Sequence, residues 1–197
     1  MLGGRCATCK TAISPHYPLV ELGNGLLYVF LYHQYHLSVQ SIVFALLATA
    51  LFIVSCIDIV HTIIPDAITL PGIVVGMCSS LWLTPVGIGN AILGVLLGGG
   101  LFLLMAVLSV ILLKREGMGG GDIKLIAMIG AFLGWQAVLV TIFFGAVLGA
   151  FVGIILILLR RQGRKEPLPF GPFLALGALL AMVWGDAILT WYVSHFS

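Results

Sequence analysis

The chain has 197 residues, of which 61% are hydrophobic and 8% are charged, and its mean hydropathy is +1.20. These values lie far from those of soluble domains and indicate a polytopic membrane protein. The net charge is only +2, and no basic stripe is interleaved with aromatic residues, so nucleic acid is not expected as a partner. Composition therefore predicts the lipid bilayer as the surroundings of most of the chain.

Charged residues occur in clusters, and the stretches between the clusters predict the topology. Three long stretches contain no Asp, Glu, Lys or Arg: residues 22–57, 67–113 and 125–159. Each has about 35 to 47 residues, whereas one helix needs about 20 to cross the hydrocarbon core, so each stretch predicts a helical hairpin. The hairpins are expected to reverse at 33–36, 84–87 and 134–136, and a last span covers about 172–193. Because only helices satisfy a spanning backbone without closing a barrel, we predict an all-α protein with about seven transmembrane helices.

Basic residues gather at one end of these hairpins. They are Arg5, Lys10, Lys114, Arg115, Lys124, Arg160, Arg161, Arg164 and Lys165. The turns at the other end carry no formal charge. By the positive-inside rule, the basic end is expected to face the cytoplasm. The outward limb of the third hairpin has only some 12 residues, which predicts a tilted or partly re-entrant segment.

Glycines recur four residues apart in two of the apolar stretches. Gly94 and Gly98 form one such set, and Gly145, Gly149 and Gly153 form the other. Small residues at this spacing let two helix backbones approach closely in a membrane. We therefore expect the helices that carry them to pack tightly against neighbours.

Two aspartates on the basic side do not fit a role in topology. Asp58 ends a long apolar run in a segment that has no Lys or Arg, and Asp122 ends a run of glycines. Ionisable groups at the edge of a membrane span are costly and tend to mark function. If the two carboxylates share a water, one can take its proton while the other donates to a substrate carbonyl and later to the leaving amine. A helix N-cap is the alternative role for Asp122, and also for Asp66, but no such role fits Asp58.

Several neighbours are candidates to support this pair. His61 follows Asp58 by three residues and faces it if the helix continues; otherwise it is an interfacial histidine. Lys124 lies close to Asp122 in sequence. The glycines at 119–121, Gly119, Gly120 and Gly121, permit close backbone approach and movement of the loop when a substrate arrives.

Only two of the four cysteines form a motif, Cys6 and Cys9 in a Cys-x-x-Cys pair. One such pair supplies half of a four-coordinate zinc site, so two further ligands would have to come from elsewhere. A structural zinc knuckle and no role at all remain equally open. Redox activity is a further alternative, although no βαβ pattern surrounds the pair.

Taken in order, these motifs resemble the type IV prepilin peptidases, aspartic proteases of the GxGD type. The matching residues are Asp58 with Ile64-Pro65-Asp66, the run Gly119 to Lys124, Pro18 to Leu22, and Pro169 to Gly177. By itself the Pro169-Phe170-Gly171-Pro172 stretch fits either a connector or a segment that lines a site.

The resemblance implies a multi-pass enzyme of the bacterial inner membrane with its active site facing the cytoplasm. Such enzymes cut the short basic leader from type IV prepilins and type II secretion pseudopilins after a glycine, with no cofactor for proteolysis. It assigns Asp58 and Asp122 as the catalytic pair. It also implies a cytoplasmic segment over residues 1–18 and a helical membrane protease domain over residues 19–197.

The sequence departs from the family pattern in one respect. Members usually carry an additional first span and two Cys-x-x-Cys pairs that bind zinc, in a loop tied to methylation of the new N-terminus from S-adenosylmethionine. Here only the second pair is matched, by Cys6 and Cys9. This argues against complete zinc coordination and methyl transfer, and leaves proteolysis unaffected.

Two other functions are compatible with carboxylates in membrane spans. A proton- or ion-coupled transporter uses such groups as relays, but transporters commonly have internal repeats and midplane sites, and the acids here fall at one edge. A GxGD protease that cuts within a span, similar to the signal peptide peptidases, shares the chemistry and differs in the position of the scissile bond.

Overall fold

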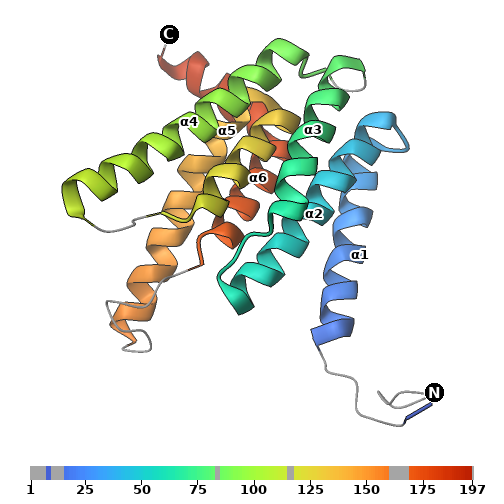
Figure 1. The fold of residues 1–197 in the computed structure, drawn as a ribbon. Helices are drawn as coiled ribbons and strands as arrows, with labels where there is room; N and C mark the ends of the chain where they lie inside the picture. Colours follow the sequence, from blue (N-terminus) through green and yellow to red (C-terminus); the bar gives the residue numbers. More distant parts are fainter. Residues whose placement is uncertain (1–7, 10–15, 83–84, 115–117, 160–168, 197) are drawn as a thin grey trace.

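The computed structural model describes residues 8–9, 16–82, 85–114, 118–159 and 169–196. This part of the chain is helical and contains no strand (Figure 1). The helices are α1 His16–Tyr35, α2 Val39–His61, α3 Asp66–Trp82, α4 Ile88–Leu113, α5 Gly120–Leu158 and α6 Gly171–Phe196. The predicted all-α class is confirmed.

Four of these helices, α2, α4, α5 and α6, are long and apolar enough to cross a membrane, and α3 is a shorter apolar helix. Large apolar side chains are exposed along them: Val74, Leu96 and Phe143 are each more than 60% exposed. So much exposed apolar surface would be a liability in water but is what lipid requires. The chain is a polytopic membrane protein, as the composition predicted.

Helix α5 contains a sharp break at Gly134, where φ is 82° and ψ is 174°. A residue with a Cβ rarely adopts this φ, so glycine is the residue that allows the reversal. The break divides α5 into a first limb, residues 120–133, and a second limb, residues 135–158. It lies where the third hairpin was predicted to turn, and with the limbs counted separately the described residues form seven helical segments. The first limb is about 21 Å long, shorter than the roughly 30 Å hydrocarbon core, as expected for a short outward limb.

Glycines define how α3 and α4 pack on the first limb of α5. A Cβ added to one of these glycines would fall against a specific residue of that limb: Gly72 against Met128, Gly76 against Phe132, Gly94 against Gly130, and Gly98 against Ile126. The first two pairs run in parallel register and the last two in antiparallel register. Helices α3 and α5 therefore start at the same end of the molecule, and α4 ends there.

The second limb of α5 packs antiparallel to α6. Its glycines and those of α6 again mark the contacts: Gly145 lies against Leu174, Gly149 against Phe170, and Gly177 against Thr141. The predicted close packing is confirmed at Gly94, Gly98 and Gly145, whereas a Cβ on Gly149 would make only ordinary contacts with phenylalanine rings. Because α6 begins beside the end of this limb, the second limb returns to the end of the molecule from which the first limb departed.

The core lies among α2, the first limb of α5, and α6. Its fully buried side chains include Leu47, Leu51, Leu125, Met128 and Leu174. Helix α1 is at the edge of the bundle (Figure 1). It is followed by a left-handed residue, His36, and by the capping box of Ser38 and Ser41 that starts α2. The first reversal therefore lies slightly later than the predicted 33–36, because α1 continues to Tyr35.

Candidate active site

Asp58 lies in the last turn of α2 and is only 5% exposed. The helix continues to His61 and ends at Thr62, whose left-handed conformation brings its N–H to the carbonyl oxygen of Asp58. The carboxylate of Asp58 accepts a hydrogen bond through Oδ2 from the backbone N–H of Gly171, at 2.9 Å. The start of α6 is therefore joined directly to the buried acid at the end of α2.

Asp122 lies in the first turn of α5 and is half-buried. The N-cap residue of this helix is Gly119, which makes no side-chain cap hydrogen bond, and the Asp122 N–H donates to the Gly119 carbonyl at 3.1 Å. The N-cap interpretation of Asp122 is therefore wrong, because two of the three glycines are already helical and place the acid inside the helix. Its carboxylate accepts a hydrogen bond from the backbone N–H of Gly119 and lies near enough to that of Asp58 for the two charges to repel each other. The structure brings together the two acids that the sequence singled out.

Ile64 is the side chain that joins the three helix ends around these acids. It is buried, at 8% exposure, in the segment that follows Asp58. A Cβ on Gly121 would lie 2.7 Å from the Ile64 Cβ, and a Cβ on Gly171 would lie 3.3 Å from its Cδ1. The starts of α5 and α6 thus approach the same isoleucine closely because both carry glycine there.

The three glycines of the GxGD motif have unequal surroundings. Gly121 packs on Ile64, and a Cβ on Gly119 would lie 3.2 Å from Oδ2 of Asp122. At Gly120 a Cβ would meet nothing within 4 Å. Close packing on Ile64 therefore explains why position 121 is a glycine, and nearness to the Asp122 carboxylate explains the glycine at position 119. Neither reason applies to Gly120.

Lys124 and Asp66 form an ion pair beside this site. The lysine Nζ donates to both carboxylate oxygens of Asp66, at 2.7 and 2.6 Å, and so connects the start of α3 with the start of α5. The two side chains are 38% and 55% exposed. Asp66, predicted as a possible N-cap, is the first residue of α3, and its carboxylate binds this lysine.

We expect this pair to contribute little to stability. A double-mutant cycle with Lys124→Met and Asp66→Asn should give a coupling of about 0.2 to 1 kcal/mol, because exposed ion pairs are well solvated. Denaturant unfolding of the protein in detergent measures it, with Lys114→Met as a matched removal of charge at the end of α4. A coupling of several kcal/mol would show that the pair is buried in the membrane-embedded protein.

The remaining predicted site residues do not join the acids. His61 is exposed, although the helix does continue as its predicted role required. Cys6 lies outside the described residues, and Cys9 is exposed. Within the described part of the chain, no three metal-binding side chains lie together. The half zinc site at Cys6 and Cys9 therefore stays a prediction, and no chemical step below uses it.

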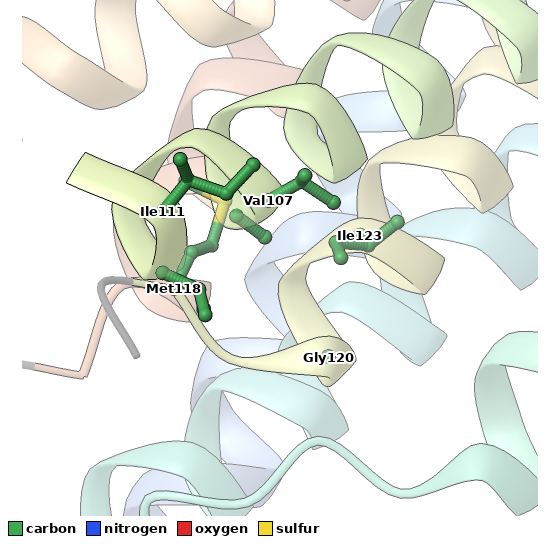
Figure 2. Close-up of a pocket in the computed structure, with 7 residues that line it drawn as sticks. Val107, Ile111, Met118, Gly120 and Ile123 are labelled. Atoms are coloured by element: carbon green, nitrogen blue, oxygen red, sulfur yellow. The ribbon is translucent and has the colours of Figure 1, made fainter. Parts of the chain in front are cut away.

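An apolar groove of about 410 Å³ lies between the end of α4 and the start of α5. Figure 2 shows Val107 and Ile111 on α4 beside Met118, and Ile123 and Gly120 at the start of α5. Neither Asp58 nor Asp122 lines this groove. The groove is therefore a neighbour of the two acids and does not contain them.

Known proteins are similar to nearly the whole chain. The sequence model of the type IV leader peptidase family matches residues 45–154, and that of the bacterial peptidase A24 N-terminal domain matches residues 1–35. The chain is 38% identical over 195 residues to the prepilin leader peptidase/N-methyltransferase of Aeromonas hydrophila, covering 99% of this chain and 67% of that protein. The chain belongs to the type IV leader peptidase family.

Other members of the leader peptidase family are similarly close. The proteins of the same name from Pseudomonas putida and Pseudomonas aeruginosa are 38% and 36% identical over 187 and 192 residues. These alignments cover 95% and 98% of this chain but 65% and 66% of the relatives, so the chain spans about two thirds of their length. No solved structure matches the chain. Family membership confirms the resemblance drawn from the motifs, and neither the relatives nor the described residues favour a transporter.

Two residues at this leader peptidase site were missed as site residues by the sequence analysis. Ile64 and Gly171 were noticed only as parts of matching motifs. The available signal was the glycine between Phe170 and Pro172, where a helix begins. That pattern also fits an ordinary connector, so the sequence did not reveal its contact with Asp58.

Proposed function

We propose that this chain is an aspartic endopeptidase that removes the leader peptide from type IV prepilins and type II secretion pseudopilins. The observation that carries the proposal is that Asp58 and Asp122, the acids of the family motifs, lie at one end of the bundle, near enough for their charges to interact. Family membership and the names of the relatives support the same activity.

The proposed reaction uses the two carboxylates and one water. Two like charges in a poorly hydrated site repel each other, so the resting pair holds one proton between its members. The ionised carboxylate removes a proton from water, whose oxygen attacks the scissile carbonyl, while the protonated carboxylate donates to the carbonyl oxygen. Collapse of the tetrahedral intermediate breaks the C–N bond, and the amine leaves with a proton from the pair. The products are one carboxylic acid and one amine, and the pair regains its single proton.

The proposed orientation places this end of the bundle at the cytoplasmic face of the bacterial inner membrane. Lys114 and Lys124 lie at this end, at the end of α4 and the start of α5, and the basic cluster at 160–165 lies between α5 and α6 in sequence. Basic residues are retained on the cytoplasmic side. A basic leader attached to a hydrophobic substrate helix would emerge from the bilayer at the same level.

Cleavage of a purified type IV prepilin by the full chain in proteoliposomes tests the proposal. Mass spectrometry of the products should place the cut after the glycine that ends the leader. A cut inside the apolar segment would instead indicate a protease acting within the span. Absence of any cut, together with proton flux lost in Asp58→Asn, would indicate a transporter.

Methyl transfer and zinc binding are not part of this proposal. Of the predicted half-site, Cys6 and Cys9, only Cys9 is described, and it is exposed. The relatives' names include N-methyltransferase, but this chain spans about two thirds of their length. The proposed proteolysis draws on Asp58, Asp122 and water alone.

A further inference from the structure

The backbone of Gly171 makes a hydrogen bond that the sequence did not predict. Gly171 is the first residue of α6, and its N–H donates to Oδ2 of Asp58, a residue 113 positions earlier in the chain. Within the part of the chain that the structure describes, this is the only hydrogen bond to the Asp58 carboxylate. Because an N–H can only donate, Oδ2 is an acceptor whether or not the acid carries a proton. A proton on this acid is then favoured on Oδ1, because the unprotonated carbonyl oxygen of a carboxyl group is the better acceptor for the N–H on Oδ2.

The contact requires a glycine at this position. A Cβ at Gly171 would lie 2.7 Å from Oδ2 and 3.2 Å from Cγ of Asp58, and 3.3 Å from Cδ1 of Ile64. Both neighbours are buried, so neither can move into open space. A larger residue therefore has to displace the carboxylate or the start of α6.

We infer that Gly171 is a positioning residue of the proposed peptidase, whose N–H fixes Oδ2 of Asp58 and directs Oδ1 to the water and the substrate. This rests on the proposed function, in which Asp58 is one of the two acids. Asp58 lies on α2 and Asp122 lies on α5. The hydrogen bond from the start of α6 therefore fixes the orientation of the Asp58 carboxylate relative to Asp122. Loss of orientation at a reacting group costs rate even when binding is unchanged.

The test compares two glycine substitutions in the same helix. Gly171→Ala places a methyl group against the carboxylate, whereas Gly185→Ala, also in α6, meets nothing within 4 Å. With a purified type IV prepilin as substrate, we expect Gly171→Ala to lower kcat about 100-fold with KM changed less than about twofold. Gly185→Ala should keep both constants, and the melting temperature of Gly171→Ala should stay above the assay temperature, so that the loss of kcat is measured on folded protein. Normal kcat in Gly171→Ala would overturn the inference.

A second variant separates the carboxylate from simple crowding at Ile64. Ile64→Val removes Cδ1, the atom that a Cβ at Gly171 would approach, and leaves the contact with Asp58 in place. If the carboxylate is what matters, Ile64→Val added to Gly171→Ala leaves kcat low. Recovery of kcat in the double variant would show that Gly171 only provides space for the isoleucine, and would overturn the inference.

A spectroscopic measurement on the full chain needs neither a folded Gly171 variant nor activity. The sequence contains two Phe-Gly pairs, Phe144-Gly145 and Phe170-Gly171. With carbonyl-¹³C phenylalanine and ¹⁵N-glycine, NMR selects these two glycine amides. Asp58→Ala should move the Gly171 amide proton upfield, as a hydrogen bond is lost, and leave Gly145 in place. An unmoved Gly171 signal would refute the contact.

Asp58→Asn and Asp122→Asn, assayed in parallel, separate failure of this inference from failure of the proposed function. If both asparagine variants are inactive while Gly171→Ala is normal, only the positioning role is wrong. If both asparagine variants cleave normally, the catalytic pair is wrong and the positioning role fails with it.

Discussion

Asp58→Asn and Asp122→Asn should each reduce prepilin cleavage by about 10²- to 10⁴-fold, the usual contribution of acid–base catalysis. An amide cannot exchange the proton that the reaction requires, whichever of the two acids it replaces. The fold should persist, because asparagine is isosteric with aspartate. At position 58 its carbonyl oxygen can still accept the Gly171 N–H that Oδ2 accepts in the native protein. Initial rates on a purified type IV prepilin, with melting temperatures of the variants, measure both effects.

The double variant distinguishes a catalytic pair from two independent residues. Groups that act as a unit show strongly non-additive losses, so Asp58→Asn/Asp122→Asn should be about as slow as the slower single variant. Asp66→Asn is the matched control, since it removes a carboxylate at the same end of the bundle that binds Lys124. Near-normal rates in either single variant, or losses that multiply in the double variant, would contradict the assignment.

Gly94→Ala and Gly130→Ala should each destabilise the protein by about 1 to 3 kcal/mol, the usual cost of overpacking. A Cβ on either glycine would overlap the backbone of the other, where α4 crosses the first limb of α5. Backbone cannot rotate away as a flexible side chain can, so the two helices must separate. Denaturant unfolding in detergent gives the change in the free energy of unfolding.

Gly100→Ala provides the control for these substitutions. It lies in the same helix as Gly94, and a Cβ there would meet nothing within 4 Å. Alanine is also a better helix former than glycine, so this variant should be at least as stable as the native chain. If Gly94→Ala and Gly130→Ala were as stable as Gly100→Ala, the close crossing of α4 and α5 would be incorrect.

Hydropathy and charge are properties of local sequence, and they were sufficient to predict the order of the helical segments and where the chain reverses. The charge-free stretches predicted three hairpins, and the reversals near 84–87 and at Gly134 lie where the structure has them. The even number of crossings between Asp58 and Asp122 then required both acids to lie at the same end. Glycine spacing predicted which helices pack closely for a similar reason, since backbone approach depends on residue size along one helix face.

Local rules were less successful at the helix ends. An aspartate that follows glycines is a reasonable N-cap, yet Asp122 is the third residue of α5 because Gly120 and Gly121 are already helical. Gly121 lies there against Ile64, a residue from the other side of the site. A tertiary contact thus placed the start of this helix, and capping preferences along the sequence cannot anticipate it.

By itself, the sequence predicted the seven helical segments and the end of the bundle that carries the acids, and it singled out Asp58 and Asp122 as the proposed catalytic pair. Only the tertiary structure decided that α6 begins against Asp58, that Ile64 lies between two glycines, and that Lys124 binds Asp66. The physical reason is the distance along the chain over which each signal acts. Apolar periodicity and charge act through neighbouring residues and the bilayer. A hydrogen bond between Gly171 and Asp58 exists only once several helices have packed in one register.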